Sequence, residues 1–129
     1  MKKLILLIII LALPLVLGGC FVASTHLEIG EADKIVLRSG NDGSSVEITD
    51  SGDIGHITDN INTLRFEKVN TDKIYDGWSY DITWYGSDGE PVDSMTIISG
   101  NRVQYNDTYY DSLGATVDTA FLDRLLEGG

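Results

Sequence analysis

Cysteine is nearly absent from this chain of 129 residues, which contains a single one at position 20. Histidine is also scarce, with only His26 and His56. No stretch brings Cys, His and a nucleophile together, so the sequence gives no sign of a metal centre or a nucleophilic active site. We therefore predict no catalytic residues, no metal ligands and no cofactor.

Basic residues are few as well. The chain has nine Lys and Arg against 20 Asp and Glu, which gives a net charge of −11. Contacts with nucleic-acid phosphates need clusters of Lys and Arg, and none occurs here. An acidic surface is also repelled by nucleic acid and by anionic lipid headgroups. The composition thus excludes a nucleic-acid partner.

Only one long apolar run is present, over residues 4–17. It follows Lys2 and Lys3, and it is short for a membrane-spanning helix, which needs about 20 apolar residues. Pro14 also interrupts any helix formed by this run. The run ends in the sequence Leu-Gly-Gly-Cys at residues 17–20. Small residues beside a scissile bond let a processing protease close over the extended backbone.

This arrangement resembles the lipobox of bacterial lipoproteins. The resemblance implies that residues 1–19 are a signal peptide, that Cys20 receives a diacylglyceryl group, and that cleavage occurs before Cys20. It also implies a lipid-anchored protein on the extracytoplasmic face of a cell membrane. Two alternatives remain open, namely an ordinary secretory signal and an anchor that is never cleaved.

Cleavage at this site would leave 110 residues, enough for one domain. Losing Lys2 and Lys3 leaves seven basic residues against the 20 acidic ones, a net charge of −13. With the only thiol lipidated, no disulfide can form, so the domain must be stabilised by packing. Residues 20–33 are predicted to be the lipidated cysteine and a flexible tether, with a short strand possible over residues 26–29.

Residues 34–129 are predicted to form a single α+β domain. Its antiparallel sheet of five to seven strands is expected in the order hairpin, helix, meander and C-terminal helix, with the helices on one face. Gly, Asn and Asp-Gly turns separate the expected strands. The strands are predicted over residues 34–39, 45–49, 65–69, 77–85, 92–99, 102–105 and 109–110.

Apolar spacing locates the two helices. Ile54, Ile57, Ile61 and Leu64 form one stripe on a helix over residues 51–64, which Asp50 can cap. A second helix begins after Asp118 and carries Phe121, Leu122, Leu125 and Leu126. His56 falls off the first stripe and is expected to be exposed.

The stretch over residues 77–85 alternates with period two and places Trp78, Tyr80, Ile82 and Trp84 on one strand face. Such an aromatic row is either the core face of the sheet or a platform for carbohydrate or peptide. The core interpretation is favoured because the opposite face is polar.

The mature domain resembles small envelope lipoproteins of Gram-positive bacteria whose function is unassigned. We predict a non-enzymatic binding or accessory module with an envelope protein or peptide partner. Exposed tyrosines often make such contacts, so the candidate interaction surface is Tyr75, Tyr85, Tyr109 and Tyr110.

Two other functions are weighed against this prediction. The Asp-rich turns are compatible with a calcium-binding envelope domain, although Asp beside Gly, Asn or Ser mostly builds turns. A hydrolase using a carboxylate pair such as Asp76 and Asp81 is disfavoured, because a chain with 20 acids contains chance pairs.

Overall fold

The computed structural model describes residues 24–70 and 77–128 of the chain. Seven strands and two helices lie in these ranges: β1 (Lys34–Ser39), β2 (Ser45–Ile48), α2 (Ser51–Thr63), β3 (Arg65–Val69), β4 (Tyr80–Tyr85), β5 (Pro91–Ser99), β6 (Arg102–Tyr105), β7 (Thr108–Leu113) and α3 (Thr119–Gly128). Every strand pairing is antiparallel. The predicted α+β class and antiparallel sheet are confirmed.

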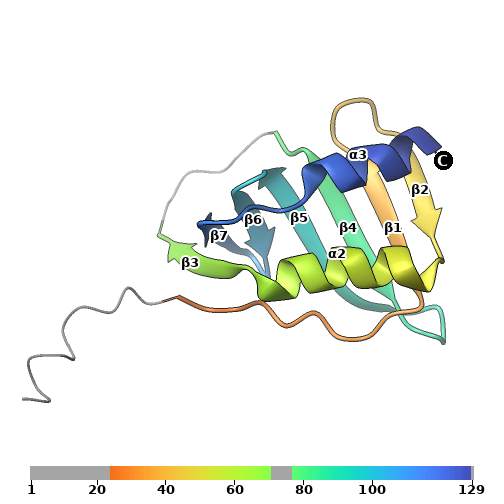
Figure 1. Cartoon of the computed structure of the whole chain (residues 1–129), viewed down its shortest axis with the longest axis horizontal. Coiled ribbons are helices and arrows are strands. Elements are labelled where there is room, and N and C mark those ends of the chain that lie inside the picture. Colours follow the sequence, from red (N-terminus) through yellow and green to blue (C-terminus); the bar gives the residue numbers. More distant parts are fainter. Residues whose placement is uncertain (1–23, 71–76, 129) are drawn as a thin grey trace, which may run out of the picture.

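The strands form one sheet in the order β2-β1-β4-β5-β6-β7-β3. Strands that are consecutive in the chain are neighbours in the sheet except for β2 and β3 and for β3 and β4. Instead, β1 pairs with β4 and β3 pairs with β7. Helix α2 carries the chain from β2 at one edge to β3 at the opposite edge (Figure 1). The predicted edge strand at residues 109–110 is therefore wrong in position and length. It is the longer strand β7, and β3 covers its outer side.

Helix α2 begins as the sequence predicts. Asp50 is the N-cap, and its Oδ2 accepts a hydrogen bond from the Asp53 backbone N–H at 2.9 Å. Such a cap satisfies one of the backbone donors that a helix start leaves unpaired. Ile54, Ile57 and Ile61 are buried, as the apolar stripe predicts.

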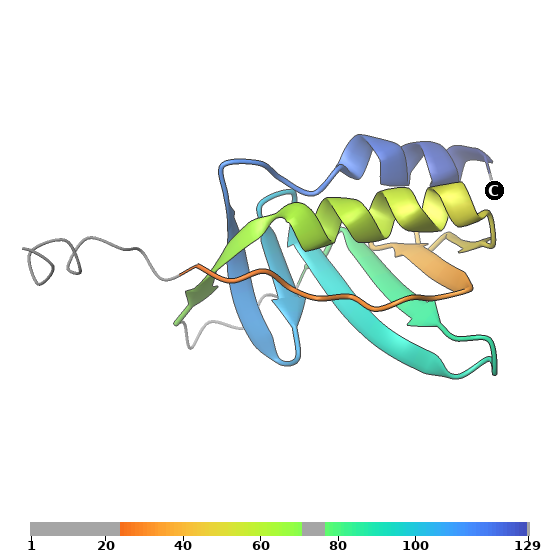
Figure 2. The same ribbon diagram turned by 60° about the horizontal axis from the view of Figure 1, so that its bottom comes forward.

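Strand β4 supplies the centre of the core. Tyr80, Ile82 and Trp84 are buried, which confirms the core interpretation for these three side chains. Trp84 Nε1 donates to Thr58 Oγ1 of α2 at 3.1 Å, and the Tyr80 hydroxyl donates to the Asp123 carboxylate of α3. Each helix is therefore bonded to a side chain of β4, and the two helices run side by side (Figure 2).

Trp78 departs from the prediction. Strand β4 begins at Tyr80, so Trp78 lies before it and is only half-buried. The Arg38 guanidinium carbon lies 5.2 Å from the Trp78 ring centroid. The alternation of apolar residues begins two positions before the strand does. For this reason the pattern wrongly assigned Trp78 to the core face.

The tether is the main correction. Residues 24–33, which we call the strap, run antiparallel to α2 along the domain (Figures 1 and 2). Leu27 and Ile29 are each 5% exposed and belong to the core. The expected strand over residues 26–29 does not form, and the strap makes only an isolated bridge between Thr25 and Phe66. Burial of two large aliphatic side chains outweighs the low periodicity that suggested a flexible coil.

Candidate functional site: a groove between the strap and helix α2

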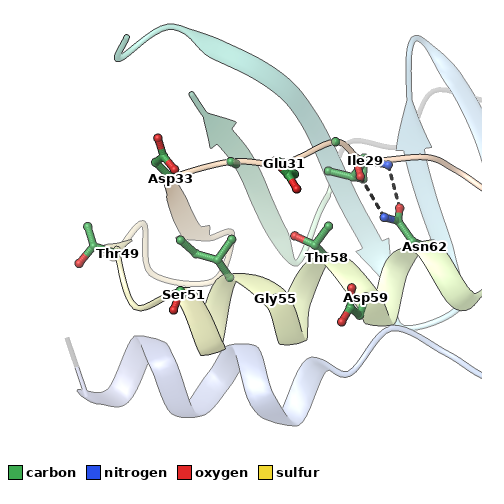
Figure 3. A pocket seen from close by; sticks show the side chains of 12 residues that line it. Ile29, Glu31, Asp33, Thr49, Ser51, Gly55, Thr58, Asp59 and Asn62 are labelled. Atoms are coloured by element: carbon green, nitrogen blue, oxygen red, sulfur yellow. Dashed lines mark hydrogen bonds between the residues drawn. The ribbon is translucent and has the colours of Figure 1, made fainter. Parts of the chain in front are cut away.

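The strap and α2 enclose a groove of about 590 Å³ (Figure 3). This volume is within the usual range for small-molecule sites, roughly 300–1,000 Å³. One wall is the end of the strap, over residues 29–33, and the other is the polar side of α2. Its twelve lining residues are Ile29, Gly30, Glu31, Ala32, Asp33, Thr49, Ser51, Ile54, Gly55, Thr58, Asp59 and Asn62.

Small residues create the space and polar residues line it. Gly30 and Ala32 on the strap and Gly55 on the helix add little bulk to the two walls, although Glu31 projects between the two strap residues. A Cβ added at Gly30 or at Gly55 would meet no atom within 4 Å. Thr49, Ser51 and Thr58 also line the groove, together with Ile29 and Ile54, so its lining is part polar and part apolar.

All the charge in the lining is negative. Glu31 and Asp33 project from the strap and Asp59 from α2, and all three are exposed. The lining contains no Lys, Arg or His. Such a site attracts cations and repels anions.

Asn62 fixes the distance between the two walls. Its Oδ1 accepts a hydrogen bond from the Ile29 backbone N–H at 2.8 Å, and its Nδ2 donates to the Ile29 carbonyl at 2.9 Å (Figure 3). At the other end of the strap, the Asp33 backbone N–H donates to the Tyr85 carbonyl at 2.9 Å. The strap wall is thus hydrogen-bonded at Ile29 and at Asp33, and the backbone between these two residues borders the groove.

The predicted interaction residues do not come together. Tyr85 lies at the end of β4, with Lys34 Nζ 4.9 Å from its ring centroid. Tyr109 pairs with Gln104 on β6, and two strands separate it from β4. Tyr110 packs edge to face with Phe66, at 6.3 Å between centroids, so its ring lies on the core side. Tyr75 and Cys20 lie outside the described residues.

Both histidines have structural roles. His26 Nδ1 lies 3.0 Å from the Leu64 carbonyl oxygen and holds the strap to the end of α2. His56 Nε2 lies 2.9 Å from Asp118 Oδ2, and its ring stacks on Phe121. The contact with His56 is the main cause that lowers the pKa of Asp118 below its usual value. His56 is half-exposed, as expected, and links α2 to α3.

Two tyrosine–carboxylate pairs border the core. Burial, together with the bond to Asp123, raises the pKa of Tyr80 to about 12. Burial and the bond to Asp93, at 2.8 Å, likewise raise the pKa of Tyr105 to about 12. Neither pair lies in the groove, so their role is to dock α3 and to join β5 to β6.

The carboxylates form no metal-binding cluster in the described chain, the groove included. Across residues 24–70 and 77–128, no three His, Cys, Asp or Glu side chains are placed to hold a metal ion. Asp81 accepts a hydrogen bond from Thr96 Oγ1 at 3.2 Å, and Asp76 lies outside the described residues.

Sequence reasoning missed the groove because it treated the strap as a tether. The alternation of Leu27 and Ile29 with exposed Glu28 is the signal that could have placed this segment on the domain. Nothing in the sequence indicates that Asn62 bonds to Ile29, 33 residues away.

No known protein family, curated protein or solved structure matches the chain. In the part of the chain that the structure describes, neither helix has the length and apolar character needed to cross a membrane.

Proposed function

We propose that this chain is a non-enzymatic binding module, anchored by a lipid on Cys20 to the extracytoplasmic face of a cell membrane. The lipobox-like sequence at residues 17–20 supports the anchor. The fold adds a stable platform, with both helices packed on one face of the sheet. Residues 1–19 are the signal peptide in this proposal, and residues 24–128 contain the binding domain.

The ligand site is the groove between the strap and α2. The observation that carries this assignment is the charge of the lining, where Glu31, Asp33 and Asp59 are the only charged side chains. We therefore propose a cationic ligand, namely a basic segment of an envelope protein or peptide. Exposed carboxylates contribute little individually, about 0.2–1 kcal/mol each, so a useful affinity needs several contacts along the groove.

The tyrosine surface is secondary in this proposal. Tyr85 and Tyr109 are half-buried and stand on the sheet face opposite the buried side chains of β4 and β6. Their separation across two strands means that one small ligand does not contact both. A partner protein of ordinary interface size would contact them together.

The test is a titration of the full chain, in detergent micelles, with a pentalysine peptide. Amide NMR shifts are expected at Gly30 and Gly55 and not at Gly86, which lies in the β4–β5 turn. Pentaglutamate serves as the matched probe of opposite charge and is expected to cause no shift in the groove.

Paired substitutions make the titration specific. Asp33→Asn with Asp59→Asn should weaken pentalysine binding by about threefold for each carboxylate. Asp42→Asn with Asp88→Asn removes the same charge from turns outside the groove and should leave the affinity unchanged. Equal weakening by both pairs would show that only the net charge matters and would remove the groove as the site.

A further inference from the structure

The position at which the strap joins the domain is fixed by hydrogen bonds. Thr25 and Phe66 exchange two backbone bonds, at 2.8 and 2.7 Å. Phe66 is the second residue of β3, whose other side pairs with β7. The chain therefore leaves the domain at the outer edge of the sheet, beside β3 (Figure 1).

Only four residues separate Thr25 from Cys20. Five residue steps span at most about 18 Å even when fully extended. Leu27, Ile29 and the Asn62 bonds hold the next part of the strap against the domain. A lipid on Cys20 would thus keep β3 close to the bilayer surface, and the strap would give little freedom to swivel.

The β3 edge carries the cations of this acidic molecule that lie next to the exit point. Arg65 and Lys68 flank the Thr25–Phe66 bridge, and both are exposed. Two exposed acids lie close to the same bridge in sequence, Glu67 directly after Phe66 and Glu28 three residues after Thr25. Among the described residues, this edge therefore carries two positive and two negative side chains and is close to neutral.

The opposite end of the molecule is acidic, although Lys34 Nζ lies 3.6 Å from Glu47 Oε1 there. β2, the start of α2 and the end of α3 meet there (Figure 1). Glu47, Asp50 and Asp53 line a single shallow hollow at this end, with Arg124 as its one basic residue, and Glu127 is exposed close by on α3. The charge is thus unevenly distributed, with the less acidic end beside the anchor.

From this asymmetry we infer that the domain stands on its β3 edge, with Arg65 and Lys68 in contact with anionic lipid headgroups. The inference rests on the proposed lipid anchor and adds an orientation to it. The net charge of the whole domain opposes contact with an anionic surface, and this orientation turns the acidic end away from that surface. A Lys or Arg near such a surface gains attraction, which falls off within a Debye length. The groove opening along α2 then remains accessible from the side.

Lysine acetylation on vesicles tests the orientation. The full chain is isolated from membranes, its mass is measured for a lipid on Cys20, and it is placed on vesicles of phosphatidylcholine alone or with phosphatidylglycerol. The rates of acetylation at Lys68 and at Lys34, on β1, are then compared by mass spectrometry. If Cys20 carries no lipid, its thiol is coupled to a maleimide phospholipid, so the orientation is tested separately from the natural anchor.

The expected result is slower acetylation of Lys68 on the anionic vesicles than on the neutral ones, with Lys34 unaffected. Arg65→Gln should reduce this protection by about fivefold, the weight of one basic residue at such a surface. Arg38→Gln, on β1, is the matched control and should have no effect. Equal rates at Lys68 on both vesicle types would overturn the inference. If both rates were equally slow compared with the chain in solution, contact with a second copy or the anchor alone would explain the result, which overturns the inference in the same way.

Discussion

Asn62 on α2 and Ile29 on the strap are joined by two hydrogen bonds, in which the amide side chain pairs with a backbone N–H and a backbone carbonyl. The amide side chain therefore bonds to the Ile29 backbone as a neighbouring strand would. This pairing fixes the position of the groove wall over residues 29–33. It also fixes the preceding part of the strap against the domain.

Asn62→Ala should free the strap. Removing the side chain leaves two backbone groups of Ile29 without their partner, at a cost of about 1–3 kcal/mol in the free energy of unfolding. Urea denaturation measures this cost, and hydrogen exchange at Ile29 should accelerate. Asn41→Ala, in the exposed β1–β2 turn, is the control. An unchanged exchange rate at Ile29 would show that Leu27 and Ile29 hold the strap without Asn62.

Gly55→Ala should have opposite effects on stability and binding. Alanine stabilises a helix interior by about 1 kcal/mol relative to glycine, and the added Cβ meets no atom within 4 Å. The free energy of unfolding should therefore rise, while the narrower groove should bind pentalysine more weakly. A variant that is more stable and binds equally well would place the ligand elsewhere.

Alkaline pH should destabilise the domain. Tyr80 and Tyr105 have pKa values raised to about 12, and tyrosine in an unfolded chain titrates near 10. Between these values the unfolded state releases protons that the folded state retains, so stability present below pH 10 is lost as the pH rises towards 12. Urea denaturation across this range measures the loss, and Tyr80→Phe with Tyr105→Phe should flatten the curve. A curve of the same slope in the double variant would contradict this origin.

Acid should act through Asp118. The contact with His56 lowers its pKa, so its contribution is present above the pKa of an unfolded Asp and is lost as the pH falls through the lower folded value. His56→Gln should therefore make the acid limb of the stability curve shallower. Thermal denaturation at a series of acidic pH values measures it. If the wild type and the variant had the same acid limb, the His56–Asp118 contact would contribute nothing to the free energy of unfolding.

Periodicity and turn residues were enough to predict most of the fold. The Ile54–Ile57–Ile61 stripe and the Asp50 cap locate α2, because the helix signal is local. The pairing of β3 with β7 was not predictable, since it joins residues about 45 apart and depends on the path of α2. The prediction that the strap is a flexible tether was wrong for the same reason, because the residues that contact Leu27 and Ile29 lie far along the chain.

The candidate site was harder to predict than the fold. Tyrosines were chosen for their exposure, yet Tyr110 packs on Phe66 and Tyr85 lies two strands from Tyr109. A groove depends on where large side chains are missing from two facing walls. Gly30 and Gly55 indicate a groove only once the strap is known to face α2.

Both the proposed anchor and the proposed orientation depend on a lipid on Cys20, which intact mass spectrometry of the chain extracted from bacterial membranes can detect. We predict a chain that begins at Cys20 and carries a diacylglyceryl group, and a Cys20→Ser variant that is no longer processed to this form. A chain that still begins at Met1, or one cleaved and released without lipid, would exclude the lipid anchor.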